Sequence, residues 1–303
     1  MKILITGGSG LLGTNFILTA SEMRNHKIFA LCNNHPLKDE FCDSFKADIL
    51  DKPKLKKLFS EINPDVVVHS AAITDVNYCE SHKEEAYKVN VDGTKNVLDA
   101  SYQAGSKSVY ISSDSLFDGR RGNYSEEDIP NPVNYYGKTK LFGEKEAEKY
   151  NSLIIRTNFY GWNAGIKKEF SEWIVKSLEA GSKVNLFTDV YFNPIIVTSL
   201  SRIIVELAEK NKKGVFNVAG REVCSRFQFG NDIAEVFGLD KSLIIPTKFS
   251  ENKSMATRPL NPTLDVSKVS KTLKEDMPNI KDGVAEMKRL RDSGYLKKLK
   301  SMF

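Results

Sequence analysis

Apolar runs and amphipathic stretches alternate along the first half of the chain. Val66, Val67 and Val68 follow one another without polar alternation, which is typical of a strand covered on both faces of a sheet. The stretches between such runs carry apolar residues at helical spacing, and they predict helices that cover those faces. The pattern predicts an α/β fold with a doubly wound parallel sheet. The predicted strands are Lys2–Thr6, Lys27–Cys32, Val66–His69, Ser108–Ser112 and Leu153–Thr157, and the predicted helices are Leu11–Arg24, Lys52–Ile62, Glu84–Gln103 and Tyr136–Tyr150.

The alternation is less regular after residue 157. We therefore expect a first domain at 1–157 and a smaller, mixed α/β substrate-binding lobe at 158–303, with some of its segments returning to the first domain. The cleft between them would lie at the carboxyl ends of the sheet strands. In this lobe the pattern predicts helices at Lys167–Ala180, Ser199–Lys210 and Arg226–Phe237, and strands at Lys183–Phe187, Gly214–Val218 and Leu243–Pro246.

Composition and charge narrow the class of protein. The chain has 303 residues, 41% of them apolar, which is enough to bury a full core. Its net charge of +5 comes from dispersed Lys and Arg, so nucleic-acid binding is not expected, whereas an anionic ligand suits the basic bias. No apolar run reaches about 18 residues, so no membrane span is expected. The cysteines at 32, 42, 79 and 224 have no metal-ligand or disulfide spacing, which predicts reduced thiols and a cytoplasmic protein.

Three glycines follow the first predicted strand and precede the first predicted helix. Gly7, Gly10 and Gly13 have the spacing that cradles a dinucleotide pyrophosphate in a Rossmann-type domain. Gly7 permits the tight turn, Gly10 allows the backbone to approach the phosphates, and Gly13 allows close helix packing. The helix N-terminus adds amide donors and the positive end of a dipole.

Tyr136 and Lys140 are the first candidates for catalysis. Their spacing places them on one face of a predicted helix. An ammonium about 4 Å from a phenol contributes on the order of 4 kcal/mol toward the phenolate at an effective dielectric of about 20, which would lower the Tyr pKa by about three. Ser113 ends the fourth predicted strand at the ligand-binding edge, where its hydroxyl could donate a hydrogen bond to a substrate carbonyl.

These elements together resemble the extended short-chain dehydrogenase/reductases that act on nucleotide sugars, and among them the dTDP-4-dehydrorhamnose reductases. The resemblance covers essentially the whole chain. Its motifs are Thr6–Gly13, Val89–Thr94, Ser112–Asp114, Tyr136 with Lys140, and Arg258–Asp265.

The resemblance implies a role for each matching residue in an NAD(P)H-dependent reduction of a 4-keto-6-deoxy sugar nucleotide to the alcohol, such as dTDP-4-dehydrorhamnose to dTDP-rhamnose. Tyr136 would protonate the keto oxygen, Lys140 would lower the Tyr136 pKa and hold the nicotinamide ribose, and Ser113 would bind the carbonyl. The implied substrate-binding residues are Ser113, Asp114, Phe159 and Arg258. The implied cofactor-binding residues are Gly7, Ser9, Gly10, Leu11, Leu12, Gly13, Asn33, Asp48, Ile49, Ala71, Ala72, Asn90, Tyr136 and Lys140.

Several positions depart from the family pattern. Ser113 stands where the family has Thr, Phe159 where a Trp lines the sugar site, and Val190 and Ile195 where the family has polar side chains. The end of the second strand, Cys32–His35, has no carboxylate to bind a ribose 2′-hydroxyl, which favours NADP over NAD.

Alternative functions stay open at this point. A nucleotide-sugar epimerase would share the glycine loop and the Tyr–Lys pair. A non-catalytic NADP-binding regulatory subunit, as in the β subunit of methionine adenosyltransferase, would share the fold. A 4,6-dehydratase is disfavoured because Ser115, and not an acid, follows Asp114. No metal site is expected, and a homodimer is possible.

Overall fold

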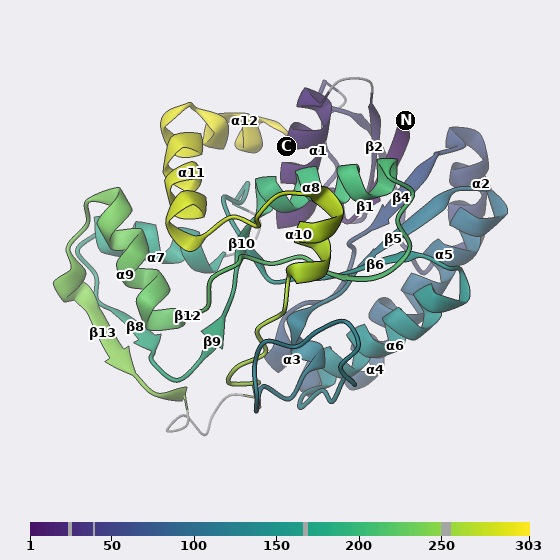
Figure 1. Ribbon diagram of the computed structural model, residues 1–303. Coiled ribbons are helices and arrows are strands. Elements are labelled where there is room, and N and C mark those ends of the chain that lie inside the picture. The colour runs from purple at the N-terminus through teal and green to yellow at the C-terminus, as the bar shows by residue number, and fades with distance from the viewer. Residues whose placement is uncertain (24–25, 39, 166–168, 250–255) are drawn as a thin grey trace.

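The computed structural model describes residues 1–23, 26–38, 40–165, 169–249 and 256–303. Its centre is a seven-stranded parallel sheet with the strand order β11-β6-β5-β4-β1-β2-β3, flanked by helices on both faces (Figure 1). The predicted Rossmann-type α/β fold is confirmed. The strands are β1 (Lys2–Thr6), β2 (Lys27–Cys32), β3 (Asp43–Lys46), β4 (Val66–His69), β5 (Lys107–Ile111), β6 (Leu153–Arg156) and β11 (Gly214–Asn217).

Alternate residues of β1 face the two helical layers. Ile3 and Ile5 belong to a large cluster that includes residues of α1 (Leu11–Glu22) and α8 (Val197–Glu209), and Leu4 belongs to a second cluster beneath α2 (Lys52–Ile62) and α5 (Gly93–Gln103). Both faces of the sheet are therefore buried, as the apolar runs predicted. The remaining helix on the second face, α6 (Tyr135–Lys149), packs beside α5.

The predicted helix 84–103 is divided into three parts. It consists of α4 (Lys83–Tyr87), a π-helical turn at Lys88–Asp92 and α5, with the short helix α3 (Val76–Ser81) ahead of it. Single π-turns inside helices are often found at functional sites. The turn carries Asn90, whose side chain is described below.

The second half of the chain supplies both a lobe and additions to the sheet. β11 pairs with β6, α8 packs on α1, and the C-terminal helices α10 (Ser267–Leu273), α11 (Ile280–Asp292) and α12 (Tyr295–Ser301) return toward that face (Figure 1). The lobe contains α7 (Phe170–Glu179), α9 (Arg226–Phe237) and three two-stranded sheets. Their strands are β7 (Phe159–Tyr160) with β10 (Ile195–Ile196), β8 (Val184–Phe187) with β13 (Ile244–Thr247), and β9 (Tyr191–Phe192) with β12 (Cys224–Ser225).

Most predicted bounds agree with the structure within two residues. The predicted positions 24, 167 and 168 lie outside the described residues, and α7 begins at Phe170. The sequence pattern did not indicate α3, β3, the short strands β7, β9, β10 and β12, or the three C-terminal helices. Among the described residues no helix is long and apolar enough to cross a membrane.

Candidate active site

The carboxyl ends of four parallel strands bring the candidate residues to one edge of the sheet. Thr6 of β1 pairs with Leu31 of β2 and with His69 of β4, and His69 pairs with Tyr110 of β5. The loops that leave these strands therefore start side by side. They carry the glycine motif, Asn33, Ala71 with Ala72, and Ser113 with Asp114.

The glycine loop is built so closely that side chains are excluded from it. Gly7 has a φ of +69°, and a Cβ there would lie 2.9 Å from the Ala71 nitrogen. A Cβ on Gly13 would lie 2.3 Å from the Gly7 carbonyl oxygen. The following helix, α1, has no side-chain cap on its first amides. This combination of a tight turn, a close helix and uncapped amides fits a pyrophosphate.

The remaining predicted cofactor residues differ in whether their side chains are exposed to a ligand or buried in the core. Leu12 and Ile49 are buried in the two apolar clusters, so their side chains serve the core. Asn33 is exposed where β2 ends, and Asp48 is exposed while its Oδ1 accepts from the Leu50 amide at 2.9 Å. The predicted residues that are half-buried are Gly7, Ser9, Leu11, Ala71, Ala72 and Tyr136, and Gly10 is exposed.

Asn90 acts inside the protein. Its Oδ1 accepts from the Ile73 amide at 2.8 Å, and its Nδ2 donates to the Ile73 carbonyl at 2.9 Å and to the Thr139 hydroxyl at 3.0 Å. Thr139 in turn donates to the Tyr136 carbonyl at 2.8 Å. Asn90 thus ties the loop after β4 to the helix that carries Tyr136, and its polar atoms are already engaged.

The first turn of α6 places Tyr136 next to Ser113. Asn134 caps the helix by accepting from the Gly137 amide at 2.8 Å, and a Cβ on Gly137 would lie 2.2 Å from the Ser115 carbonyl oxygen, so the helix packs directly on the loop after β5. Ser113 lies close enough to the Tyr136 hydroxyl to lower its pKa by hydrogen bonding, but burial raises that pKa more strongly, well above its usual value.

Asp114 is buried behind Ser113. Its Oδ1 accepts from the hydroxyls of Ser113 at 3.2 Å and Ser115 at 3.3 Å, and its Oδ2 accepts from Asn158 at 2.5 Å. Burial raises the pKa of this carboxyl despite these donors. Asp114 therefore orients the Ser113 hydroxyl.

Lys140 is turned toward the sheet, which corrects one expectation. Its Nζ donates to the Ile111 carbonyl at 2.6 Å and lies 4.3 Å from the centre of the Tyr110 ring. Burial lowers the pKa of Lys140 to about 7, with Glu144 opposing the change. The expected fall in the Tyr136 pKa is not found in this structure: burial raises that pKa, and the Lys140 Nζ is bound by the Ile111 carbonyl.

His69 is held beneath this site as a neutral ring. Thr6 Oγ1 lies 2.7 Å from its Nδ1, and Thr94 Oγ1 lies 2.9 Å from its Nε2. Because Thr94 donates its hydroxyl hydrogen to the Asn90 carbonyl, it accepts from Nε2, which assigns the tautomer. Burial and the nearby Lys140 lower the pKa of His69 to about 3. The ring therefore stays uncharged.

The other two predicted substrate residues, Phe159 and Arg258, come from the second half of the chain. Phe159 is half-buried in β7 and packs against the large apolar cluster. Arg258 donates to the Asn77 side chain at 3.3 Å and to the Ala256 carbonyl at 2.8 Å. Val190 and Ile195 are buried, so the apolar residues at these positions belong to the core.

Two further residues were not predicted from the sequence. Asn158 donates to Asp114, and Arg226 begins α9 with its guanidinium over the ring of Phe192. Arg226 lies near enough to Asp114, Glu169 and Arg258 for their charges to influence its pKa. No local spacing could have found these residues, because the contacts join distant segments.

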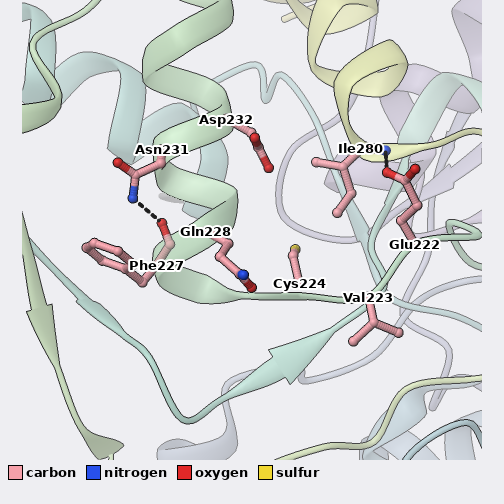
Figure 2. A pocket seen from close by; sticks show the side chains of 8 residues that line it. All are labelled: Glu222, Val223, Cys224, Phe227, Gln228, Asn231, Asp232 and Ile280. Carbon is pink, nitrogen blue, oxygen red and sulfur yellow. Dashed lines mark hydrogen bonds between the residues drawn. The ribbon is translucent and has the colours of Figure 1, made fainter.

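A pocket of about 560 Å³ lies elsewhere, between the start of α9 and α11 (Figure 2). Figure 2 shows its two carboxylates, Glu222 and Asp232, on separate elements, and the Glu222 carboxylate accepts from the Ile280 amide at 3.2 Å. Within the described residues no group of three or more acidic, His or Cys side chains could hold a metal ion.

Comparison with known families agrees with this geometry. The model of the family described as RmlD substrate binding domain matches residues 1–291. The chain belongs to this family. The resemblance to extended short-chain dehydrogenase/reductases of the dTDP-4-dehydrorhamnose reductase type is thereby confirmed.

Two curated proteins that are similar to this chain are named for different functions. The "Probable low-salt glycan biosynthesis reductase Agl14" of Haloferax volcanii is 31% identical, over 95% of this chain and 97% of that protein. The "Methionine adenosyltransferase 2 subunit beta" of Bos taurus is 30% identical, over 88% of this chain and 81% of that protein. Both a reductase and a subunit of another enzyme are therefore among the relatives of this family member.

Two solved structures share the whole fold. A hypothetical dTDP-4-dehydrorhamnose reductase from Sulfolobus tokodaii is 37% identical with a TM-score of 0.81, over 92% of this chain and 97% of that one. The dTDP-4-dehydrorhamnose reductase from Bacillus anthracis, solved in complex with NADP, is 26% identical with a TM-score of 0.81, over 95% of this chain and 98% of that one.

Proposed function

We propose that this family member reduces the 4-keto group of a nucleotide-activated 4-keto-6-deoxy sugar, with dTDP-4-dehydrorhamnose as the first substrate to test. The protein belongs to the NAD(P)-dependent oxidoreductases. The observation that carries the proposal is the placement of Ser113 and Tyr136 beside each other at the sheet edge that also holds the glycine loop.

The chain's own residues suit the binding of NAD(P). The backbone of the glycine loop and the first amides of α1 would hold the pyrophosphate, and the loop at Ala71 and Ala72 would line the cofactor. We propose NADP as the preferred form, because the exposed end of β2 at Asn33 offers an amide and no carboxylate. When bound, the reduced nicotinamide supplies a hydride to the keto carbon.

The proton reaches the keto oxygen from the protein. Tyr136, whose raised pKa keeps it protonated at neutral pH, donates that proton as negative charge develops on the oxygen. Ser113 would donate a second hydrogen bond to the same oxygen; its single hydroxyl hydrogen, which points to Asp114 Oδ1 in this structure, would turn to the substrate. Lys140, with a pKa of about 7, exchanges a proton at neutral pH; to restore the Tyr136 hydroxyl, its Nζ would first turn from the Ile111 carbonyl toward the phenol.

Turnover tests the proposal. Purified protein is incubated with NADPH and a panel of nucleotide 4-keto sugars, and the loss of NADPH absorbance is followed beside Tyr136→Phe. We expect oxidation by the wild type, with the turnover rate of the variant lower by at least about 100-fold, because one general acid contributes about 10²- to 10⁴-fold. NADPH affinity should be unchanged, since the variant lacks only one hydroxyl. A fully active Tyr136→Phe would refute the role of the phenol.

The two alternatives give different results in the same assay. Conversion of the sugar without net loss of NADPH would indicate an epimerase. Tight NADPH binding without turnover of any sugar would favour a regulatory subunit, the role suggested by the 30% identity to the bovine methionine adenosyltransferase subunit. The expected cytoplasmic location and the possible homodimer stay predictions.

A further inference from the structure

His69, at the end of β4, is bound at both of its ring nitrogens. Its Nδ1 lies 2.7 Å from the Thr6 hydroxyl oxygen, and its Nε2 lies 2.9 Å from the Thr94 hydroxyl oxygen. The three residues are each at most 1% exposed, so these bonds are shielded from solvent. Because a buried polar group without a partner is unfavourable, each member of the set depends on its neighbours.

The hydrogen bonds on the two sides of His69 run in one direction. The Ala71 amide donates to the Thr6 oxygen at 3.3 Å, which leaves the Thr6 hydroxyl hydrogen for Nδ1 of His69. On the other side the Thr94 hydroxyl donates to the Asn90 carbonyl at 2.7 Å, so its oxygen accepts from Nε2. Both sides therefore require the same tautomer of the neutral ring, with the hydrogen on Nε2.

Thr94 extends this set of bonds into the π-helical turn that carries Asn90. The Gly93 amide donates to the Lys88 carbonyl, five residues earlier, so the regular helical bonding is interrupted there. The Thr94 hydroxyl binds the Asn90 carbonyl inside the same turn. Since the Thr94 oxygen accepts from His69, the imidazole fixes the direction in which that hydroxyl points.

Beyond Asn90 the bonds reach the helix that carries Tyr136. Asn90 Nδ2 donates to the Thr139 hydroxyl at 3.0 Å, and the Thr139 hydroxyl donates to the Tyr136 carbonyl at 2.8 Å. Asn90 and Thr139 are also at most 1% exposed, and α5 and α6 lie side by side (Figure 1). A continuous buried path of hydrogen bonds therefore joins the end of β1, which leads into the glycine loop, to the first turn of α6.

We propose that His69 is a positioning residue for the reduction, which acts through Thr94, Asn90 and Thr139 to fix the first turn of α6 relative to the cofactor loops. The inference rests on the proposed function for the role of Tyr136. His69 is buried, so it acts on its neighbours and not on the substrate. Precise placement matters, because a shift of about 1 Å between reacting groups can lower a rate by about 100-fold.

Three variants interrupt or preserve the path. His69→Phe keeps a ring without nitrogens, whereas His69→Gln retains one donor and one acceptor group. Thr94→Val removes only the hydroxyl between His69 and Asn90, and it tests the path if His69→Phe does not fold. Ser108→Ala is the matched control, because it removes a buried bond of 2.6 Å, to Ser152, at the opposite end of the neighbouring strand β5.

We expect His69→Phe and Thr94→Val to lower the kcat of sugar reduction by about 10-fold, because Tyr136 remains but is less precisely held. NADPH affinity and the KM for the sugar should stay within about 2-fold of the wild type, since Thr6 can still accept from the Ala71 amide. His69→Gln should recover most of the rate, and Ser108→Ala should match the wild type. A full rate in both His69→Phe and Thr94→Val, or equal losses of kcat and NADPH affinity, would overturn the positioning role.

Hydrogen–deuterium exchange of the NADP⁺-bound full chain distinguishes this inference from the proposed function, because it needs no substrate. Peptides that cover residues 70–75, 86–94 and 134–142 should exchange faster in His69→Phe and Thr94→Val than in the wild type and Ser108→Ala, with slow exchange restored in His69→Gln. That pattern in a protein that reduces no sugar would support the path to α6 and refute the reductase. Unchanged exchange in these peptides would overturn the inference, even in an active reductase.

Discussion

Replacing Lys140 by Met should make the unfolding of this protein less dependent on pH. The pKa of Lys140 falls from 10.5 to about 7 on burial, so between these pH values the folded protein holds a neutral amine while the unfolded chain binds a proton. Stability rises with pH wherever the unfolded state binds more protons. The wild type should therefore gain stability from pH 7 toward pH 10.5, and Lys140→Met should lack this gain.

The size of this change in the free energy of unfolding follows from the fall in the Lys140 pKa. The fall in pKa corresponds to about 5 kcal/mol when fully expressed below pH 7, and each pH unit inside the window contributes about 1.4 kcal/mol. Loss of the bond to the Ile111 carbonyl costs the variant about 1 to 3 kcal/mol at every pH. The net result is a variant that is more stable than the wild type near pH 7, with an advantage that shrinks by about 2 to 3 kcal/mol between pH 7.5 and 9.5.

Urea unfolding at both pH values, followed by tryptophan fluorescence, measures this difference. Lys138→Met, an exposed position on the same helix, is the control and should follow the wild type at both pH values. Other titrating groups, such as Glu169, are common to all three proteins, so they cancel in the comparison. A difference between wild type and Lys140→Met that stays constant from pH 7.5 to 9.5 would refute the assignment of a neutral buried amine.

Two other substitutions test the loops around the site. Gly13→Ala places a Cβ 2.3 Å from the Gly7 carbonyl oxygen, so we expect a loss of about 1 to 3 kcal/mol in stability and weaker NADPH binding by titration; unchanged NADPH affinity would contradict the cradle. Asn90→Ala removes three hydrogen bonds and should lower the free energy of unfolding by about 2 to 4 kcal/mol, against about 1 kcal/mol for Asn96→Ala, which removes one bond to the Ile49 carbonyl. Equal urea midpoints for these two variants would argue against the Asn90 bridge.

The sequence alone predicted those strands and helices whose formation depends on residues close together in the chain. The bounds of β1, β2, β4, α2 and α9 agree with the sequence patterns, because an apolar run or an amphipathic stretch reports burial directly. The glycine spacing likewise predicted a loop in which Gly7 takes a positive φ and Gly13 touches backbone. These features need only residues that are near one another in the chain.

Only the tertiary structure determined the protonation states of the site residues and the groups that they contact. The spacing of Tyr136 and Lys140 placed them on one helix face, but the Lys140 amine donates to the carbonyl of Ile111 in β5. Burial raises the pKa of Tyr136 and lowers that of Lys140, so it favours the neutral form of both side chains. Arg226 and Asp114 are far apart in the sequence, yet the folded chain brings them close enough for the Asp114 charge to act on the pKa of Arg226. Desolvation and charge pairing depend on distances between segments far apart in sequence, which no local pattern contains.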